Sequence, residues 1–212
     1  PFFAFVSFTS PHDPRMAPKE YEEMFNTEKI SIPENFLPIH PFDNGELIIR
    51  DENLLPFPRT EEAVLGELAS YYAMISEVDD NIGKILDALE KSGKYDNTII
   101  IFASDNGLAV GQHGLIGKQN LYDHSIRVPL IFSGPGIKKG VLTESLVYLH
   151  DLFPTIADLV GIETPKIIHA KSLKPILDNP NETVRENVFY LYKNFQRGVR
   201  TKDWKLIKYL VD

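Results

Sequence analysis

A short segment between two apolar stretches collects residue types that bind ions. Asp105 and Asn106 come directly after the apolar run 97–104 and begin a glycine-rich loop, residues 105–118. Lys118 follows Gly117 at the end of this loop. A carboxylate beside an amide carbonyl offers hard oxygen ligands of the kind that Ca²⁺ takes, with Mg²⁺ as the alternative. The ammonium of a lysine is a compact charge that holds an anionic oxygen. The segment therefore predicts a cation site beside a site for an anionic group.

Two histidines and an arginine follow in the same part of the chain. His113 and His124 change charge near neutral pH, so either could move a proton or contact an anion. Arg127 begins the next apolar stretch, and its guanidinium could form a fork on an anion or a carboxylate. For His124 packing behind the loop is an equal alternative, and for Arg127 a structural ion pair is the more ordinary account. From the residue types alone, a role at the predicted site and a structural role both stay open for all three.

One more histidine is connected to the site through the expected sheet. His12 comes just after the apolar run 2–8. If 2–8 and 97–103 are parallel strands, His12 and Asp105 share the edge at which α/β sheets bind ligands. Metal, lysine and histidine at one edge predict a site for a tetrahedral oxyanion ester. The alternatives are plain turns, because Asp-Asn-Gly is common turn chemistry and a histidine between prolines often lies at the surface.

The elements that must position these residues can be read from hydrophobic periodicity. Apolar residues recur at helical spacing over 60–93, with Thr60 as the N-cap and Gly93 at the end. The β-branched run 97–104 predicts a strand buried on both faces. The remaining segments predict shorter elements: helices at 17–25, 151–161 with Asp151 as cap, and 172–179, and strands at 2–8, 127–136 and 145–149.

These elements together predict an α/β fold with a largely parallel sheet flanked by helices. The alternating stretches 187–192, 196–201 and 203–210 predict a small antiparallel C-terminal sheet. We expect a domain boundary near residue 162, with 1–162 in the α/β domain and 163–212 forming a linker and the start of the small subdomain. In that small sheet, Arg197 and Arg200 could reach a substrate, although cross-strand charge pairs are the simpler account.

The composition excludes several classes of function. The formal net charge of −8 argues against a nucleic-acid partner, which requires a basic surface. The chain has no cysteine, so it has no disulfide, thiolate metal site or cysteine nucleophile. No apolar run is long enough to span a membrane. The N-terminal stretch lacks the basic region and cleavage site of a signal peptide, and we expect that the chain was cut out of something longer.

The motifs resemble those of a known family. SDNG after a buried strand, followed by GxHGLxGKxNLYxHSxRVPLIxxGPG over 111–136, looks like the second half of the sulfatase catalytic domain, in the alkaline phosphatase superfamily. FVSFTSPHDP, YLHDLFPTIADLVGI and YLYKNFQRGVRTKDWKLIKY resemble the family's preceding strand, following helix and small C-terminal sheet. The resemblance implies that Asp105 and Asn106 are calcium ligands, that Lys118 binds the sulfate and the leaving oxygen, and that His12 contacts the sulfate or protonates the leaving group. It also implies substrate-binding positions for His113, His124 and Arg127, at the rim of the pocket or behind it.

The chain departs from the family at the nucleophile. Sulfatases use a formylglycine made from Cys or Ser in a C/S-x-P/A-x-R motif, and this chain has no such motif. The paired N-terminal aspartates of the calcium site are also absent. The resemblance therefore implies the C-terminal part of a sulfatase, inactive by itself, whose partners are a small sulfate ester such as a sulfated glycan and the missing N-terminal half. By resemblance the parent protein would be periplasmic or secreted.

Two other functions stay open. The parent could be a phosphodiesterase or phosphonate hydrolase of the same superfamily, although the Asp-Asn pair favours a single hard cation. The chain could also be a non-catalytic binding module, whose exposed sheet edges would lead to self-association. The proline-containing loop 26–59 is a plausible specificity element, with Arg50, Asp51 and Arg59 as polar candidates.

Overall fold

The structure is a computed structural model that describes residues 1–210, so Val211 and Asp212, at the end of the predicted C-terminal subdomain, lie outside the described residues. The chain forms two compact units that do not follow the sequence order. Unit 1 comprises residues 1–42, 47–96 and 108–117, and unit 2 comprises residues 43–46, 97–107 and 118 onward. The boundary near residue 162 stays a prediction.

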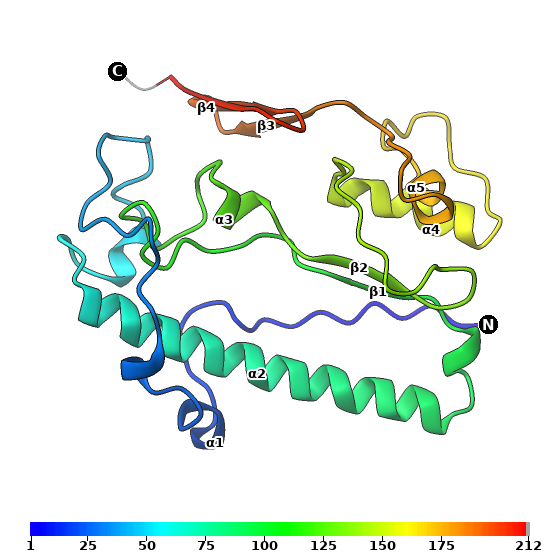
Figure 1. The fold of residues 1–212 in the computed structure, drawn as a ribbon, viewed down its shortest axis with the longest axis horizontal. Coiled ribbons are helices and arrows are strands. Elements are labelled where there is room, and N and C mark those ends of the chain that lie inside the picture. Colours follow the sequence, from blue (N-terminus) through cyan, green and yellow to red (C-terminus); the bar gives the residue numbers. More distant parts are fainter. Residues whose placement is uncertain (211–212) are drawn as a thin grey trace. The chain divides into compact units, whose positions relative to one another are not determined.

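The main element of unit 1 is the long helix α2, Glu61–Lys91 (Figure 1). Thr60 caps it as predicted, because its side chain accepts a hydrogen bond from the main-chain N–H of Ala63. Val64 and Leu68 on its inner face are buried in a cluster with residues of the glycine-rich loop and of the loop 26–59. The short helices are α1 (Lys19–Glu22), η1 (Thr27–Lys29) and η2 (Glu52–Leu54). The predicted helices at 17–25 and 60–93 are confirmed.

The N-terminal stretch 2–8 is not a strand, so that prediction is wrong for the described structure. Its side chains are largely exposed, Phe5 by 85%. An extended segment becomes a strand only when a neighbouring backbone accepts and donates its hydrogen bonds. The described residues do not supply such a neighbour to 2–8, and the parallel pairing with 97–103 is therefore not formed.

Unit 2 begins its sheet with two short strands. β1 (Ile100–Ala103) pairs antiparallel with β2 (Leu130–Ser133), with Ile100 opposite Ser133 and Ala103 opposite Leu130. Both strands were predicted, but the burial of 97–104 on both faces was wrong, because Phe102 is exposed. All strand pairs in the described residues are antiparallel, so the largely parallel sheet is not seen within this part of the chain.

The middle of unit 2 is mostly helical turns. Its helices are α3 (Asp123–Ile126), η4 (Leu149–Asp151), α4 (Leu152–Leu159) and α5 (Lys174–Asp178). The 3-10 helix η3 (Tyr95–Asn97) spans the point in the sequence where unit 1 ends at Asp96 and unit 2 resumes. The helices predicted at 151–161 and 172–179 are confirmed. The strand predicted at 145–149 is wrong, because side chains and not a β-ladder hold the segment in place. The Ser145 hydroxyl donates to the carbonyl of Glu182, and the Thr143 hydroxyl to that of Pro180.

Asp151 does more than begin a helix. It was predicted as an N-cap, but its buried carboxylate makes no capping bond to α4. It accepts instead from the main-chain N–H groups of Tyr148 and Lys171 and from both terminal nitrogens of Arg185. One carboxylate therefore joins three distant segments of unit 2.

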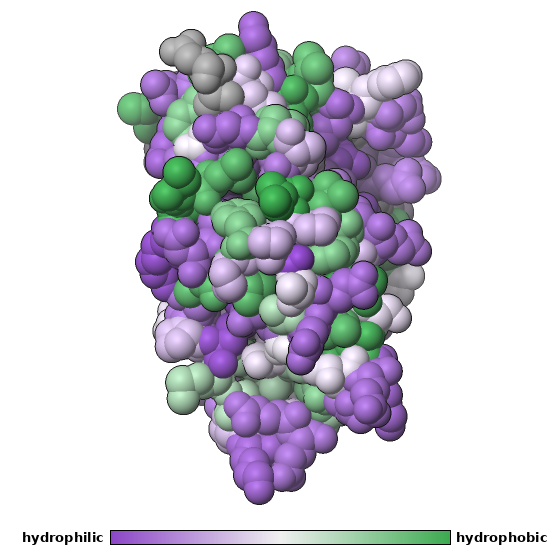
Figure 2. Space-filling view, turned by 90° about the vertical axis from the view of Figure 1, so that its left-hand side faces the viewer, coloured by the Kyte–Doolittle hydropathy of each residue, from purple (hydrophilic) through white to green (hydrophobic). Residues whose placement is uncertain are grey.

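The predicted C-terminal antiparallel sheet is confirmed. β3 (Val188–Tyr192), β4 (Gln196–Arg200) and β5 (Lys205–Tyr209) form a meander in that order (Figure 1). Val188 and Gln196 point to the buried face, whereas Phe189 and Leu206 are exposed. Exposed apolar side chains also occur elsewhere in the chain, and Figure 2 shows a face on which such groups interrupt the hydrophilic surface.

Candidate active site

The Asp-Asn-Gly turn follows β1 in unit 2 and is fixed by its own hydrogen bonds. Asp105 Oδ1 accepts from the main-chain N–H of Asn106 at 2.9 Å. The Ser104 hydroxyl donates to the Asn106 carbonyl at 2.8 Å, and Asn106 Nδ2 donates to the Gly107 carbonyl at 2.9 Å. Within the described residues these bonds leave Asp105 Oδ2 and Asn106 Oδ1 without a hydrogen bond.

A close backbone contact joins this turn to helix α3. The Gly107 N–H donates to the Ser125 carbonyl at 2.9 Å. A Cβ placed on Gly107 would lie 1.9 Å from the carbonyl oxygen of His124, so only glycine allows the approach. The sequence signal for this contact is the glycine itself. The contact places the Asp105–Asn106 turn against the segment that carries His124.

The two oxygens fit part of a calcium site. Carboxylate and amide oxygens suit a hard cation. Asp105 is exposed, so a cation could reach its carboxylate. Calcium takes about six to eight oxygen ligands, however. Across residues 1–210 no group of three or more His, Asp or Glu side chains gathers closely enough to hold a metal. The described residues could thus offer two ligands at this turn, and a complete calcium site would need oxygens from elsewhere.

Lys118 lies in the same unit, in the segment that connects the glycine-rich loop to α3. Its main-chain N–H donates to Gln119 Oε1 at 3.0 Å, and its carbonyl accepts from the Asn120 N–H at 2.8 Å. Asn120 is buried, and its side-chain oxygen accepts from the Tyr122 N–H at 3.1 Å. The segment forms no helix or strand of its own, so side-chain hydrogen bonds fix the path of the chain at Lys118.

His124 and Arg127 lie at α3 in unit 2. His124 is partly buried, with Nδ1 2.9 Å from the Ser125 hydroxyl and its ring beside that of Tyr122. Arg127 follows the helix and is exposed, and within the described residues its side chain makes no ion pair. The ordinary account of Arg127 as a structural ion-pair partner is therefore not supported. Their substrate roles stay predictions.

His12 and His113 belong to unit 1. His12 is 40% exposed at its side chain, and its Nδ1 lies 2.8 Å from the carbonyl oxygen of the next residue, Asp13. His113 adopts a positive φ of 55° and contacts Asn35 through both main chain and side chain. His113 is thus tied to the loop 26–59. The roles predicted for these two histidines stay predictions.

Sequence reasoning missed a buried ion pair beside the glycine-rich loop in unit 1. Glu52 accepts from the main-chain N–H groups of Ile116 and Gly117, each at 2.9 Å, and from Arg59 at 2.8 Å. Arg59 is only 2% exposed, so it cannot contact a substrate as predicted. Arg50 forms ion pairs with Asp13 and with Asp51, so part of the charge that it could offer to a substrate is already neutralised. No local pattern signals the contacts of Glu52 with Ile116 and Gly117 or of Arg50 with Asp13, which are far apart in the sequence.

A second missed cluster ties α3 to the C-terminal sheet. Asp123 accepts from Arg200 at 2.8 Å and from Lys205 at 2.7 Å. Burial raises the pKa of Asp123, but hydrogen bonds from Lys205 and Arg200 outweigh it and hold that pKa below its ordinary value. Arg200 therefore has a fixed partner in α3 and not a cross-strand one, and Arg197 donates to main-chain carbonyls of Lys193 and Gln196.

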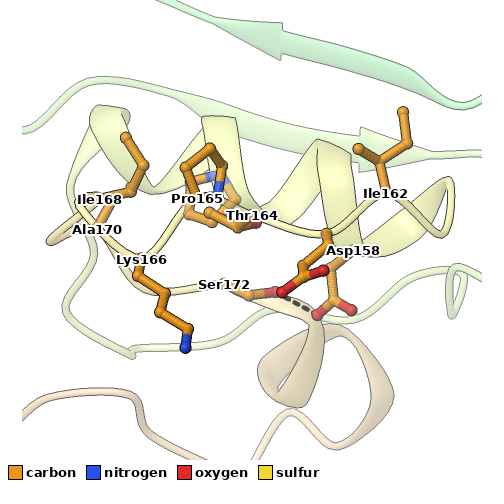
Figure 3. A pocket seen from close by; sticks show the side chains of 10 residues that line it. Asp158, Ile162, Thr164, Pro165, Lys166, Ile168, Ala170 and Ser172 are labelled. Carbon is orange, nitrogen blue, oxygen red and sulfur yellow. Dashed lines mark hydrogen bonds between the residues drawn. The ribbon is translucent and has the colours of Figure 1, made fainter.

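The pocket of unit 2 in Figure 3 lies away from these residues. It measures about 420 Å³ and is lined by the end of α4 and the loop after it. Its charged side chains are Asp158, which accepts from the Ser172 hydroxyl at 2.7 Å, together with Glu163 and Lys166. None of the predicted site residues lines it, so it carries no part of the predicted chemistry.

A family model named Sulfatase matches residues 1–162. The chain belongs to the sulfatase family. An N-acetylglucosamine-6-O-sulfatase of Bacteroides thetaiotaomicron is 38% identical over 157 residues, which is 68% of this chain and 28% of that protein. A choline-sulfatase of Rhizobium meliloti is 34% identical and covers 86% of this chain and 36% of its own length. This sulfatase chain spans 28% to 42% of the length of the eight curated relatives compared.

Solved structures agree with the family. A structure in complex with its substrate D-glucosamine-2-N,6-O-disulfate has a TM-score of 0.68 at 36% identity, over 72% of this chain and 33% of that one. A phosphonate monoester hydrolase of Agrobacterium radiobacter has a TM-score of 0.84 at 26% identity, over 99% of this chain and 48% of that one. The predicted α/β class of the alkaline phosphatase type is thereby confirmed as a partial fold.

Proposed function

We propose that the natural full-length protein hydrolyses sulfate esters and that this chain is its C-terminal part. The observation that carries the proposal is the sulfatase match over residues 1–162. The motif resemblance of the segment 104–136 is the support for assigning Asp105, Asn106 and Lys118 to the site. These three residues lie in one compact unit. The coverage of about a third of the relatives and the lack of a C/S-x-P/A-x-R motif support the view that the nucleophile lies elsewhere in the parent protein.

Each residue has a distinct part in this proposal. Asp105 and Asn106 would be two of the ligands of Ca²⁺, which when bound would neutralise charge on the sulfate group. The Lys118 ammonium holds a sulfate oxygen and stabilises the charge that develops on the leaving oxygen. His12, by resemblance, donates a proton to that oxygen or contacts the sulfate. His113, His124 and Arg127 border the substrate.

The metal part of the proposal can be tested by metal analysis of the purified full-length protein. We expect one calcium per chain in the wild type and loss of most of it in Asp105→Ala, with the fold unchanged by circular dichroism. Asp79→Ala is the control, because this acid lies on helix α2 of unit 1. Calcium retained at full occupancy in Asp105→Ala would refute the ligand assignment.

Among sulfate esters we propose a sulfated glycan. The support is that one relative is an N-acetylglucosamine-6-O-sulfatase and that one structural neighbour holds a glucosamine disulfate. Initial rates of the full-length protein with glucosamine 6-sulfate and with choline sulfate would rank the two classes. We expect kcat/KM to favour the sugar, and a preference for choline sulfate would refute this part of the proposal.

A second reaction is favoured by a specific observation. Two phosphonate monoester hydrolases are structural neighbours, with TM-scores of 0.78 and 0.84. The same residues could bind a phosphonate, which is also a tetrahedral anionic ester. The comparison of kcat/KM for 4-nitrophenyl sulfate and 4-nitrophenyl phenylphosphonate decides between them. We expect the sulfate to be the better substrate, and a higher value for the phosphonate would move the protein to the second reaction.

The chain by itself is proposed to be inactive and to self-associate. Within the described residues, β1 and β2 each have one edge without a strand partner, and Phe102 and Ile131 are exposed on them. In the parent protein the missing N-terminal half would cover such edges. Sedimentation of residues 1–212 should show species larger than a monomer, and a monomer at high concentration would refute this.

Two further parts of the proposal come from family resemblance. We propose a periplasmic or secreted location for the parent protein, which cell fractionation would test. Within residues 1–210 no helix has the length and apolar character needed to cross a membrane. We also propose that the subdomain boundary lies near residue 162, where limited proteolysis should cut first.

A further inference from the structure

The side chain of Gln196, at the start of β4, connects three segments of unit 2. It is completely buried. Its Nε2 donates to the main-chain carbonyl of Asn44 at 3.0 Å and to that of Gln119 at 3.2 Å. A side-chain amide has two N–H donors, and both are used here. The C-terminal sheet therefore holds two loop segments that are far from it in the sequence.

One of those carbonyls belongs to the residue after Lys118. Gln119 also accepts the Lys118 N–H through its own side chain, and the Asn120 N–H closes back on the Lys118 carbonyl. The peptide groups on the C-terminal side of Lys118 are thus set by a short chain of hydrogen bonds that ends at Gln196. Because this segment has no helix or strand of its own, the direction of the Lys118 side chain depends on those bonds.

The other carbonyl belongs to a segment that is itself fixed against the β3–β4 turn. Gly45 has a φ of +88°, and a Cβ on it would lie 2.6 Å from the Phe195 ring. Lys193 forms an ion pair with the buried Glu46. Asn44 Oδ1 accepts from the Glu46 N–H at 2.9 Å. The Gln196 amide therefore lies between two segments that each have further hydrogen bonds or close contacts of their own.

We propose that Gln196 is a positioning residue for Lys118, and that the C-terminal sheet thereby sets the geometry of the anion site. The inference rests on the proposed role of Lys118 in sulfate binding. Gln196 does not touch the substrate. It orients the Gln119 carbonyl, and through it the backbone from which the Lys118 ammonium extends. Without the two N–H donors of Gln196, the carbonyls of Asn44 and Gln119 would lose this hydrogen bond. The segment that carries Lys118 could then shift.

The test measures the inhibition constant of inorganic sulfate as a competitive inhibitor of the full-length enzyme, in the wild type and in variants. Gln196→Glu keeps the shape of the side chain but replaces the N–H donors with acceptors. A displacement of about 1 Å near a reacting group costs up to about 100-fold, so we expect sulfate binding to weaken about tenfold. Val188→Ala is the matched control, since it empties a buried position in the same sheet, opposite Arg200 at the far end of β4 from Gln196.

A double-mutant cycle with Lys118→Ala separates positioning from general stability. If Gln196 acts through Lys118, Gln196→Glu should have no further effect on sulfate inhibition once Lys118 is alanine. Equal weakening in both backgrounds, or weakening no larger than in Val188→Ala, would overturn the inference. If Lys118→Ala alone leaves sulfate inhibition unchanged, the proposed role of Lys118 fails, and the inference fails with it for a different and recognisable reason.

A second variant covers the case in which Gln196→Glu does not fold. Gln196→Asn keeps the amide but shortens the side chain, so it cannot reach both carbonyls. We expect about threefold weaker sulfate inhibition, again absent when Lys118 is alanine. Wild-type inhibition by sulfate in a folded Gln196→Asn protein would also overturn the inference.

Discussion

The buried pair of Glu52 and Arg59 predicts a large loss of stability when its carboxylate is removed. In Glu52→Ala, Arg59 keeps its charge at 2% exposure with no carboxylate beside it. The N–H groups of Ile116 and Gly117 also lose their acceptor. Because of these losses, we expect that the glycine-rich loop is no longer held in place in unit 1 when Glu52 is removed.

The magnitude follows from these contacts. Removing one partner of a buried ion pair costs about 3–5 kcal/mol, and each orphaned buried N–H about 1–3 kcal/mol. The terms overlap because the loop relaxes, so we expect a loss of about 4 kcal/mol. That is a large fraction of the roughly 5–15 kcal/mol by which proteins are stable.

The assay is urea unfolding of the full-length protein, followed by tryptophan fluorescence and circular dichroism. The control is Glu23→Ala, which breaks an exposed ion pair to Lys19 one helical turn away, where both side chains are more than half exposed. Exposed pairs contribute about 0–1 kcal/mol. If Glu52→Ala lowered stability no more than Glu23→Ala, the reasoning from burial would be wrong.

Two further predictions concern unit 2. Burial raises the pKa of the Asp151 carboxyl, but hydrogen bonds from Arg185 and from two main-chain N–H groups outweigh it and hold this pKa below its ordinary 3.8. Because the pKa of Asp151 is lower in the folded state than in the unfolded state, its ionised carboxylate stabilises the fold above about pH 4. This stabilisation is lost as the pH falls through the pKa of the folded state. The difference in free energy of unfolding between the wild type and Asp151→Asn, measured from urea midpoints, should therefore become smaller from pH 7 to pH 3. A difference that stays constant would contradict this. Gly107→Ala should reduce sulfate-ester hydrolysis by the full-length protein at least about tenfold, since its Cβ would meet the His124 carbonyl at 1.9 Å and shift the Asp105–Asn106 turn. Gly83→Ala, in open space on α2, should leave the activity unchanged, and equal activities in the two variants would count against a tight turn.

Local patterns predicted the elements that carry their own signal. Helix α2 follows from its spacing of apolar residues and from Thr60, and the C-terminal sheet follows from alternation. The Asp105–Asn106 turn and Lys118 were identified from residue types and family motifs, and unit 2 contains both. These features depend on neighbours a few residues away, which a sequence displays directly.

Features that depend on distant partners were not predictable in the same way. The run 2–8 has the composition of a buried strand, yet no strand pairs with it in the described residues. Glu52, which holds Ile116 and Gly117, and Gln196, which holds Asn44 and Gln119, act across large separations in sequence. A lone Glu in a loop and a lone Gln at a strand start carry no signal of such contacts, because only the tertiary fold brings the partners together.

The central claim is that Lys118 belongs to a site that hydrolyses sulfate esters. The most direct test is kcat/KM of the full-length protein for 4-nitrophenyl sulfate in Lys118→Ala, beside Lys139→Ala as an exposed lysine control. Removing one donor to a developing anionic oxygen costs about 100- to 1,000-fold. We expect that loss of kcat/KM in Lys118→Ala and wild-type activity in Lys139→Ala. An active enzyme with equal kcat/KM in both variants would contradict it.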